Sequence, residues 1–399
     1  MPDDTPSRPG RPGRPGRPGR PGRRRTPGTP PAVLKFGGPS FRTPAAYLRV
    51  ARALDARIGA DGQRLAVVVS AGPGETEQLR QRLLDVDPQP EDAVTAGLVT
   101  LADTVGAHLL AAALHRTGRD VRVLTGHELG LVTDSSFMWA RIDRIDPGPL
   151  RAALAEHEVV VVPGGQAADA GGRPTWLGKN SSDLSAVAVA VALEARRCEI
   201  HSDVDGIYST DPHLVTGTRL LPRVSWDTAS LMSLYGAKVL HRRAVRLAQR
   251  HRVEIVCRDN RPPFPEGTRI GTEGGSVAVV VLNQRSVALG YPDDSEADRA
   301  FSVFHRAGVD TVRLRDAPMV AVIGGYLDPD RLQRRAGLRP GRFEGVPVAV
   351  IRGSGVTVRL ASDEEDALHL AQRLHDRIED ADALDASGAP LRAPRLQGA

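Results

Sequence analysis

The sequence of 399 residues predicts an α/β fold in which a mainly parallel sheet carries helices on both faces, followed by a smaller α+β region. Two observations predict the sheet. Strand-like runs such as 64–74 (RLAVVVSAGPG) are apolar without alternation, and segments with a helical spacing of apolar residues separate them. A third observation predicts the second region, because from Ser276 onward short elements follow in the order strand, helix, strand, strand.

The composition is that of an ordinary globular protein of two or three domains, with 41% hydrophobic and 25% charged residues. The sequence shows no signal peptide and no apolar run of the roughly 18 residues that a membrane span needs, so we expect a cytoplasmic protein without a membrane partner. Cys198 and Cys257 are far apart and belong to no CxxC pair. We expect them to be buried apolar residues rather than zinc ligands or a disulfide.

The positive charge is concentrated in residues 1–30, a repeating Arg-Pro-Gly segment. Eight arginines stand there against two aspartates, a net charge of +6 in a chain whose total is +5, so residues 31–399 carry a net charge of −1. This segment has no apolar run to bury and is expected to be a disordered tail. It could touch polyanions, but a solvated extension without a defined partner is the favoured interpretation, and nucleic acid is not an expected partner.

Lysine occurs only three times, at Lys35, Lys179 and Lys238, against fifty arginines. A lysine is a compact, strongly hydrated charge on a flexible stem, unlike the planar guanidinium of arginine. In a chain so biased toward arginine, the positions of the three lysines test any functional interpretation.

The elements of the first region follow from their patterns in order. An apolar strand at 32–40 ends in a Gly-Gly turn and precedes a helix at 45–58, and the strand within 64–74 ends in a second glycine-containing loop. The remaining elements are a long helical stretch at 91–117, strands at 119–126 and 158–168, a strand that passes into a turn-rich loop at 198–212, a helix at 224–251 and a strand at 253–259. In open parallel sheets, ligands bind at the carboxyl ends of the strands, where these loops would gather.

The second region reads as two small units. A strand at 276–284, a helix near 295–307 and strands at 311–316 and 317–328 form the first unit. A weaker echo follows, with strands at 346–354 and 356–363 and a helix at 364–378. Two such units side by side predict a ligand-sensing or dimerising module over 276–382, whose second unit lacks its first strand and helix. Residues 383–399 are expected to be a flexible tail.

Four motifs in the loops carry candidate chemistry. KFGG (35–38) ends the first strand, where two glycines let backbone N–H groups approach a phosphate, although a Gly-Gly turn is more often structural. LGKNSSD (177–183) is a polar loop ahead of a helix, a place that often holds a phosphate or carboxylate. SDVDGIYSTDP (202–212) gathers three carboxylates and three hydroxyls, with a turn of Asx-type hydrogen bonds as the alternative. GAKVLHRRAV (236–245) places Lys238 near or inside a helix, with His241 as a packing residue.

KFGGPS, VVVSAGPG, LGKNSSDLSAVAVAVAL, CEIHSDVDGIYSTDP and GAKVLHRRAV occur in the order and spacing seen in the aspartate kinases of the amino-acid-kinase superfamily, and over 33–260 the chain resembles that family. The C-terminal units resemble its paired ACT domains. The resemblance implies a three-layer α/β/α sandwich as the catalytic domain over 31–265 and a tandem ACT-like regulatory region over 276–382. Acetylglutamate and uridylate kinases, which lack the KFGG opening and the ACT-like units, fit less well.

The resemblance implies transfer of the γ-phosphoryl group of ATP, with Mg²⁺, to a carboxylate of an amino acid. It also implies a homo-oligomer with an amino-acid effector at the ACT-like region. A carboxylate nucleophile is already ionised, so no general base is needed. Lys35, Lys238, Mg²⁺ and backbone N–H groups would offset the charge on the transferring oxygens.

The resemblance assigns roles position by position. The catalytic residues are expected to be Lys35, Lys238 and Asp183. Nucleotide binding is expected of Lys35, Phe36, Gly37, Gly38, Ser70, Ser202, Asp203, Tyr208, Ser209, Thr210, Asp211, Pro212, His213 and Lys238. Acceptor binding is expected of Ser40, Asp103, Lys179, Asn180, Ser181 and Ser182. No protein residue is assigned as a metal ligand. All three lysines fall within the motifs that carry the resemblance.

The departures from the family pattern cluster on the acceptor side. Pro39 replaces a threonine, Asp103 a glutamate, and Lys179 the arginine that would clamp a carboxylate through two hydrogen bonds. Asn180 and Ser181 replace glycines. L-Aspartate is the default acceptor. A related amino or carboxylic acid, and a catalytically weak regulatory paralogue that binds nucleotide or amino acid, stay open as alternatives.

Overall fold

The structure is a computed structural model that describes residues 30–386, with gaps at 238–239, 275–276, 315 and 325–327. An eight-stranded sheet forms its centre. The strand order is β12 (Arg223–Ser225), β14 (Glu266–Gly271), β13 (Glu254–Asp259), β9 (Arg197–Ser202), β1 (Ala32–Phe36), β2 (Leu65–Val69), β6 (Val159–Pro163) and β3 (Val121–Val123). All neighbours run parallel except β13 and β14, so the prediction of a mainly parallel sheet is confirmed.

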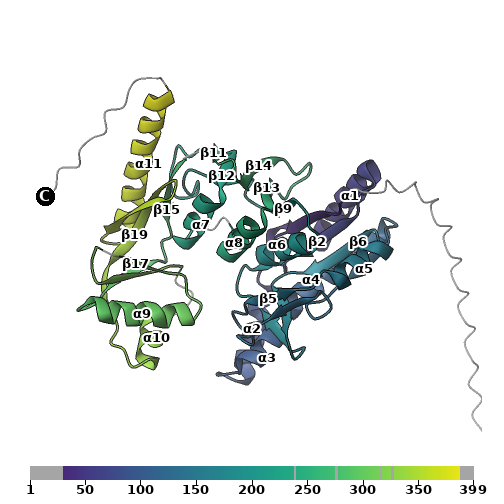
Figure 1. Ribbon diagram of the computed structural model, residues 1–399, viewed down its shortest axis with the longest axis horizontal. Coiled ribbons are helices and arrows are strands. Elements are labelled where there is room, and N and C mark those ends of the chain that lie inside the picture. Colours follow the sequence, from purple (N-terminus) through teal and green to yellow (C-terminus); the bar gives the residue numbers. More distant parts are fainter. Residues whose placement is uncertain (1–29, 238–239, 275–276, 315, 325–327, 387–399) are drawn as a thin grey trace, which may run out of the picture.

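Helices cover both faces of this sheet. Leu34 and Phe36 of β1 pack in one core with α1 (Pro44–Asp61) and α4 (Leu101–Arg116). Val33 packs on the opposite face, in the core that holds α5 (Gly148–Glu156), α6 (Ser182–Ala192), α7 (Trp226–Leu234) and α8 (Arg242–His251). Successive side chains of a strand point to opposite faces, so Lys35 shares the face of Val33 and points toward α6. The predicted α/β/α sandwich is confirmed (Figure 1).

Smaller elements surround the carboxyl ends of the central strands. A four-stranded sheet has the order β5 (Ile142–Ile145), β4 (Leu131–Thr133), β7 (Gln166–Asp169) and β8 (Pro174–Trp176). The other elements are η1 (Gly38–Phe41), α2 (Glu75–Val86), α3 (Asp92–Val99) and the pair β10 (Ile207–Tyr208) and β11 (Leu220–Leu221).

One predicted strand and one predicted helix are each divided into two in the structure. The strand expected at 158–168 is β6 and β7 in different sheets, because the chain turns at Gly164, where a β-carbon would lie 2.4 Å from Cβ of Ser182. The single helix expected at 224–251 is wrong, since α7 and α8 are separated. Gly236, between them, has a left-handed backbone (φ +101°), and its carbonyl accepts a hydrogen bond from Asn283 Nδ2 at 3.1 Å.

The C-terminal α+β region is built from two joined sheets. One holds β16 (Val287–Gly290), β18 (Met319–Val322), β17 (Thr311–Leu314) and the beginning of β19 (Arg342–Arg352). In the other, the rest of β19 pairs with β15 (Ala278–Leu282) and β20 (Gly355–Ala361). The helices are α9 (Asp294–Arg306), α10 (Pro329–Arg335) and α11 (Glu364–Ala386). Figure 1 shows this region, green to yellow, at one end of the molecule, next to α7.

The strand pairing corrects the assignment of β15. The sequence pattern gave β15 to the first unit and left the second without its first strand. In the structure β15 pairs with the later strand β19 and packs against α11, so it belongs to the second unit. Short antiparallel strands of similar composition do not reveal their partners from sequence. Helix α11 also runs to Ala386, past the expected end of the region at 382.

Two further expectations concern the membrane and the cysteines. Among the described residues one helical segment, Asp92–Arg116, is long and apolar enough to cross a membrane, and 56% of its apolar window is buried inside the protein. This segment is α3 and α4, and α4 packs against β6, β3 and α1. Cys198 and Cys257 are buried and unbridged, as expected.

Candidate active site

The carboxyl end of β1 and the first turn of α6 meet at a buried ion pair. Lys35 Nζ lies 2.8 Å from Asp183 Oδ1, and the two side chains are only 11% and 9% exposed. The other carboxylate oxygen of Asp183 accepts a hydrogen bond from the backbone N–H of His241 at 3.2 Å. A lysine fixed in this way presents positive charge at a strand end, beside the N-terminus of a helix that favours anions.

The loop after β2 joins the same site. Ser70, the first residue beyond β2, shares a hydrogen bond of 2.7 Å with the hydroxyl of Ser182. The loop also abuts the KFGG turn, since a β-carbon on Gly38 would lie 2.6 Å from the carbonyl oxygen of Ala71. Only glycine permits this approach. The structure therefore brings together Lys35, Gly37, Gly38, Ser70, Ser182 and Asp183.

Asp103, on α4, reaches this loop from the opposite side. Its carboxylate accepts a hydrogen bond from the backbone N–H of Ala71 at 2.9 Å. Burial raises the pKa of Asp103 to about 7, although the backbone hydrogen bonds and the positive charge of Lys35 lower it. A buried carboxyl that is costly to ionise favours the arrival of a cation, such as the ammonium group of an amino acid.

The loop 177–183 (LGKNSSD) wraps the start of α6. Ser181 Oγ donates a hydrogen bond to the carbonyl oxygen of Gly178 at 2.5 Å and is buried, whereas Lys179 and Asn180 are exposed at the tip of the loop. Asn180 has a left-handed backbone (φ +59°). Asparagine tolerates this conformation better than most residues, so it can follow the backbone path that a glycine would take.

The nucleotide-side motif follows β9, the neighbour of β1 in the sheet. The N–H of Gly37 donates to the carbonyl oxygen of His201 at 3.1 Å, so Ser202 and Asp203 begin beside the KFGG turn. Ser202 Oγ donates to the carbonyl oxygen of Val204 at 2.7 Å in a tight turn. Tyr208 donates to Asp205 at 2.9 Å, and Asp211 accepts from the N–H of His213 at 2.9 Å. Tyr208 and Asp211 are half-buried, whereas Asp203, Pro212 and His213 are exposed.

Three residues of the expected nucleotide set have side chains that are buried inside the protein. Ser209 is fully buried, shares a hydrogen bond of 2.8 Å with Nε2 of His375 on α11, and so faces the C-terminal region. Thr210 is also buried. The ring of Phe36 stacks on His201 inside the core with centroids 4.4 Å apart, which leaves only its backbone for a ligand.

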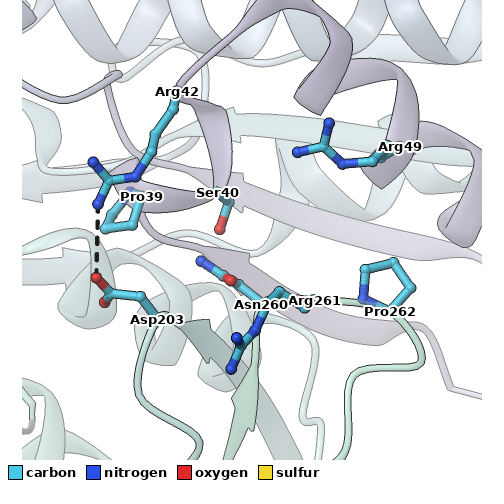
Figure 2. A pocket seen from close by; sticks show the side chains of 8 residues that line it. All are labelled: Pro39, Ser40, Arg42, Arg49, Asp203, Asn260, Arg261 and Pro262. Carbon is cyan, nitrogen blue, oxygen red and sulfur yellow. Dashed lines mark ion pairs between the residues drawn. The ribbon is translucent and has the colours of Figure 1, made fainter.

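Ser40 lies in η1, directly after the KFGG turn. It lines a cavity of about 280 Å³ at the ends of β1, β9 and β13, on the side of the sheet where α1 packs. Figure 2 shows the Ser40 hydroxyl pointing into this cavity and Arg42 reaching toward Asp203, at 4.0 Å. The cavity is lined by Pro39, Ser40, Arg42, Arg49, Asp203, Asn260, Arg261 and Pro262. Ser40 and Asp203, which is expected to bind the nucleotide, therefore line the same cavity.

Lys238 lies outside the described residues, but His241, three residues later, contacts the site. The N–H of His241 contacts Asp183, and burial, assisted by the charge of Arg243, lowers the pKa of the His241 imidazole to about 4. His241 is therefore neutral, in keeping with a packing role. Sequence reasoning missed Glu75, which accepts from the N–H of Gly72 at 2.8 Å and raises the pKa of Asp103. The sequence signal that could have found Glu75 is its place as the first residue of a helix that follows a glycine-containing loop.

The chain matches the model of the amino acid kinase family over residues 30–259. It is 37% identical to an aspartokinase of Helicobacter pylori over 241 residues, which cover 60% of this chain and 59% of the relative. An aspartokinase of Thermus thermophilus is 36% identical over 228 residues, 57% of this chain and 56% of the relative. The chain thus spans less than two thirds of the length of these curated relatives.

Solved structures extend the likeness to the C-terminal region. E. coli aspartokinase III in complex with aspartate and ADP covers 87% of this chain and 99% of its own, with a TM-score of 0.65 and 21% identity. The same enzyme with lysine and aspartate has a TM-score of 0.62 and 20% identity. The aspartate kinase of Synechocystis covers 91% of this chain and 71% of its own, with a TM-score of 0.53 and 27% identity. The two E. coli structures show a shared fold.

Proposed function

Because the chain belongs to the amino acid kinase family, we propose that it transfers the γ-phosphoryl group of ATP to a carboxylate of an amino acid, most simply L-aspartate, to give 4-phospho-L-aspartate. The observation that carries this proposal is the buried Lys35–Asp183 pair at the end of β1, joined to the loop after β2 by Ser70 and Ser182. The names of the relatives, which are aspartokinases, support the choice of acceptor.

The charges at the site suit phosphoryl transfer. The transferring group spreads negative charge over its oxygens, and the protein acts mainly by positioning and by neutralising that charge. Lys35, held by Asp183, supplies one fixed ammonium, and Gly37 lies beside it, since a β-carbon there would be 3.4 Å from Lys35 Nζ. We assign Lys238 the second ammonium. The acceptor carboxylate is already ionised near pH 7 and needs no general base.

Mg²⁺ is expected to come with ATP. In the part of the chain that the structure describes, no group of three or more His, Cys, Asp or Glu side chains could hold a metal by itself. Mg²⁺ commonly keeps several waters and binds through one or two carboxylates and the phosphates, so these residues fit a metal carried by the nucleotide. Asp183 is the carboxylate that would reach it, directly or through water. When bound, the ion supplies positive charge to the phosphate oxygens.

Asp103 and the loop 177–183 form the acceptor side of the proposal. Asp103 would accept the ammonium group, and its own carboxylate would become ionised as that cation arrives. Ser181 and Ser182 shape the loop, and Lys179 and Asn180 form its tip. A related amino or carboxylic acid is a second candidate acceptor, because a lysine cannot clamp a carboxylate through two parallel hydrogen bonds as an arginine does.

We also infer roles for the rest of the chain. The nucleotide would rest against Ser70, Ser202, Asp203, Tyr208 and residues 211–213, beside the KFGG turn. The C-terminal ACT-like region would bind an amino-acid effector and help to form a homo-oligomer in the cytoplasm. The lysine in a structure of E. coli aspartokinase III supports the kind of effector, since lysine is an amino acid.

The test is turnover of a panel of acceptors. Purified protein, MgATP and hydroxylamine are incubated with L-aspartate, D-aspartate, L-glutamate and succinate, and hydroxamate and ADP are measured. Hydroxamate with L-aspartate alone supports the proposal. Hydroxamate with another acid would identify that acid as the acceptor. Nucleotide binding without turnover of any acid favours the regulatory paralogue.

A further inference from the structure

Trp139 touches two glycines from different parts of the fold. It lies in the loop between β4 and β5, and it is half-buried. A β-carbon on Gly178 would lie 2.6 Å from Cε3 of the indole, and one on Gly308 would lie 2.8 Å from its Cγ. Gly178 belongs to the acceptor loop 177–183, and Gly308 to the turn after α9 in the C-terminal region. The six-membered ring thus rests on one glycine and the five-membered ring on the other.

The backbone on either side of Trp139 is hydrogen-bonded to the start of the acceptor loop. The N–H of Trp176 donates to the carbonyl oxygen of Phe137 at 2.7 Å. The N–H of Ala140 donates to the carbonyl oxygen of Trp176 at 3.0 Å. One side chain spans the two segments, because Arg243 donates to the carbonyl oxygens of Leu177 at 3.1 Å and of Ala140 at 2.6 Å. The segment that carries the indole is therefore held against the start of the loop.

A second contact links the same place to the C-terminal region. Arg242, the neighbour of Arg243 on α8, lies 3.7 Å from the carboxylate of Asp310, two residues after Gly308. Each glycine has a left-handed backbone, φ +103° at Gly178 and φ +74° at Gly308, and neither has room for a side chain against the ring. The indole is thus a close-fitting spacer between the loop and the turn.

We propose that Trp139 is a positioning residue, which sets the place of the acceptor loop and makes it depend on the turn 307–310 of the C-terminal region. A shift of Gly178 would reach the site through few contacts. Ser181 donates a hydrogen bond to the carbonyl oxygen of Gly178, and Ser182 shares a hydrogen bond with Ser70. A displaced indole would shift these serines, which act on the acceptor, and would leave in place the nucleotide-side residues that follow β9. This inference rests on the proposed function for the identity of the ligand.

Two alanine substitutions form a matched pair. Gly308→Ala places a methyl group against the indole, whereas Gly337→Ala, at φ +71° in the same region, places one in open space. The left-handed φ is similar at the two glycines, +74° and +71°, so alanine adds a similar backbone strain at each. We expect Gly308→Ala to raise KM for L-aspartate about tenfold, equal to about 1.4 kcal/mol, with KM for ATP unchanged. We expect Gly337→Ala to leave both constants unchanged. Equal effects of the two variants would overturn the proposal.

A double-mutant cycle tests whether the indole carries the effect. Trp139→Ala should raise KM for L-aspartate, and Trp139→Phe, which keeps a ring, should recover part of the loss. Gly308→Ala should add nothing in the Trp139→Ala background, because the ring that its methyl group displaces is absent. Additive effects on KM would contradict a route through Trp139.

Hydrogen exchange separates this inference from the proposed function. Amide exchange of a peptide covering 176–184 should be faster in Trp139→Ala and Gly308→Ala than in the unmodified chain and in Gly337→Ala. This readout needs no turnover. A protein that phosphorylates no amino acid but shows this exchange pattern refutes the proposed function and keeps the positioning role. Unchanged exchange in all three variants refutes the positioning role, whatever the activity.

Discussion

The ammonium of Lys35 and the carboxylate of Asp183 lie 2.8 Å apart, and this pair ties the end of β1 to the first turn of α6. Both side chains are almost buried, and the second oxygen of Asp183 is held by the N–H of His241. The flexible stem of the lysine is thereby fixed before any ligand binds. A fixed charge in a poorly solvated site stabilises a developing anion more than a mobile one does, because no reorganisation is needed during the reaction.

Replacing Lys35 by methionine tests this charge. We expect kcat to fall by about 10²–10³-fold, the usual effect of removing one preorganised charge donor from such a site. The free energy of unfolding should also fall by about 3–5 kcal/mol, because Asp183 is left as a buried unpaired charge. Steady-state kinetics and urea unfolding measure the two effects. Lys35→Met/Asp183→Asn is the control: it should recover stability without activity, and recovery of activity would contradict the assignment.

The raised pKa of Asp103 predicts a pH-dependent stability. In the folded protein its pKa is about 7, above the ordinary value of 3.8, so the folded state binds more protons than the unfolded state between these values. The contribution of Asp103 is fully present below the lower value and is lost as pH rises through about 7. Asp103→Asn should therefore gain stability relative to the parent as pH rises from 5 to 8. Urea unfolding at several pH values measures this, and parallel pH curves for the two proteins would count against a buried, proton-binding Asp103.

The left-handed backbone of Asn180 predicts the effect of two substitutions. Asn180→Gly should leave stability unchanged, whereas Asn180→Ala should cost about 1 kcal/mol, because alanine lacks the short polar side chain that makes this conformation tolerable. Thermal unfolding measures the difference. Arg252, exposed and at φ +55° after α8, offers a matched control. Alanine there should cost less stability, because arginine already lacks the short polar side chain of asparagine, and it should not change KM for L-aspartate; the same change in KM at both positions would remove Asn180 from the acceptor site.

Lys179→Arg tests whether the loop 177–183 has been altered toward another acceptor. If L-aspartate is the substrate, a guanidinium should add one charge-assisted hydrogen bond and lower KM for L-aspartate about tenfold, or about 1.4 kcal/mol. KM for ATP should stay the same. Lys179→Met should raise KM for L-aspartate in the same assay. Identical KM values for the parent and both variants would show that residue 179 does not meet the acceptor.

Much of the sheet could be predicted from the sequence, because strands buried on both faces are apolar throughout, as at 64–74. Lys35, Ser182 and Asp183 could be grouped because each stands at a strand end or helix start. Contacts between distant segments could not be predicted. Ser209 looked like part of a ligand loop, yet its partner His375 lies 166 residues away. The break at Gly236 depends on Asn283, and the pairing of β15 depends on β19, which only the folded chain brings near.

The measurement that tests the account most directly is ³¹P nuclear magnetic resonance of the reaction mixture. Unmodified protein, MgATP and L-aspartate should give an acyl phosphate resonance together with ADP, and Lys35→Met at the same concentration should form both about 10²–10³-fold more slowly. No acyl phosphate from the folded, unmodified protein, or an undiminished signal from Lys35→Met, would contradict the central claim that the Lys35–Asp183 site transfers phosphate to a carboxylate.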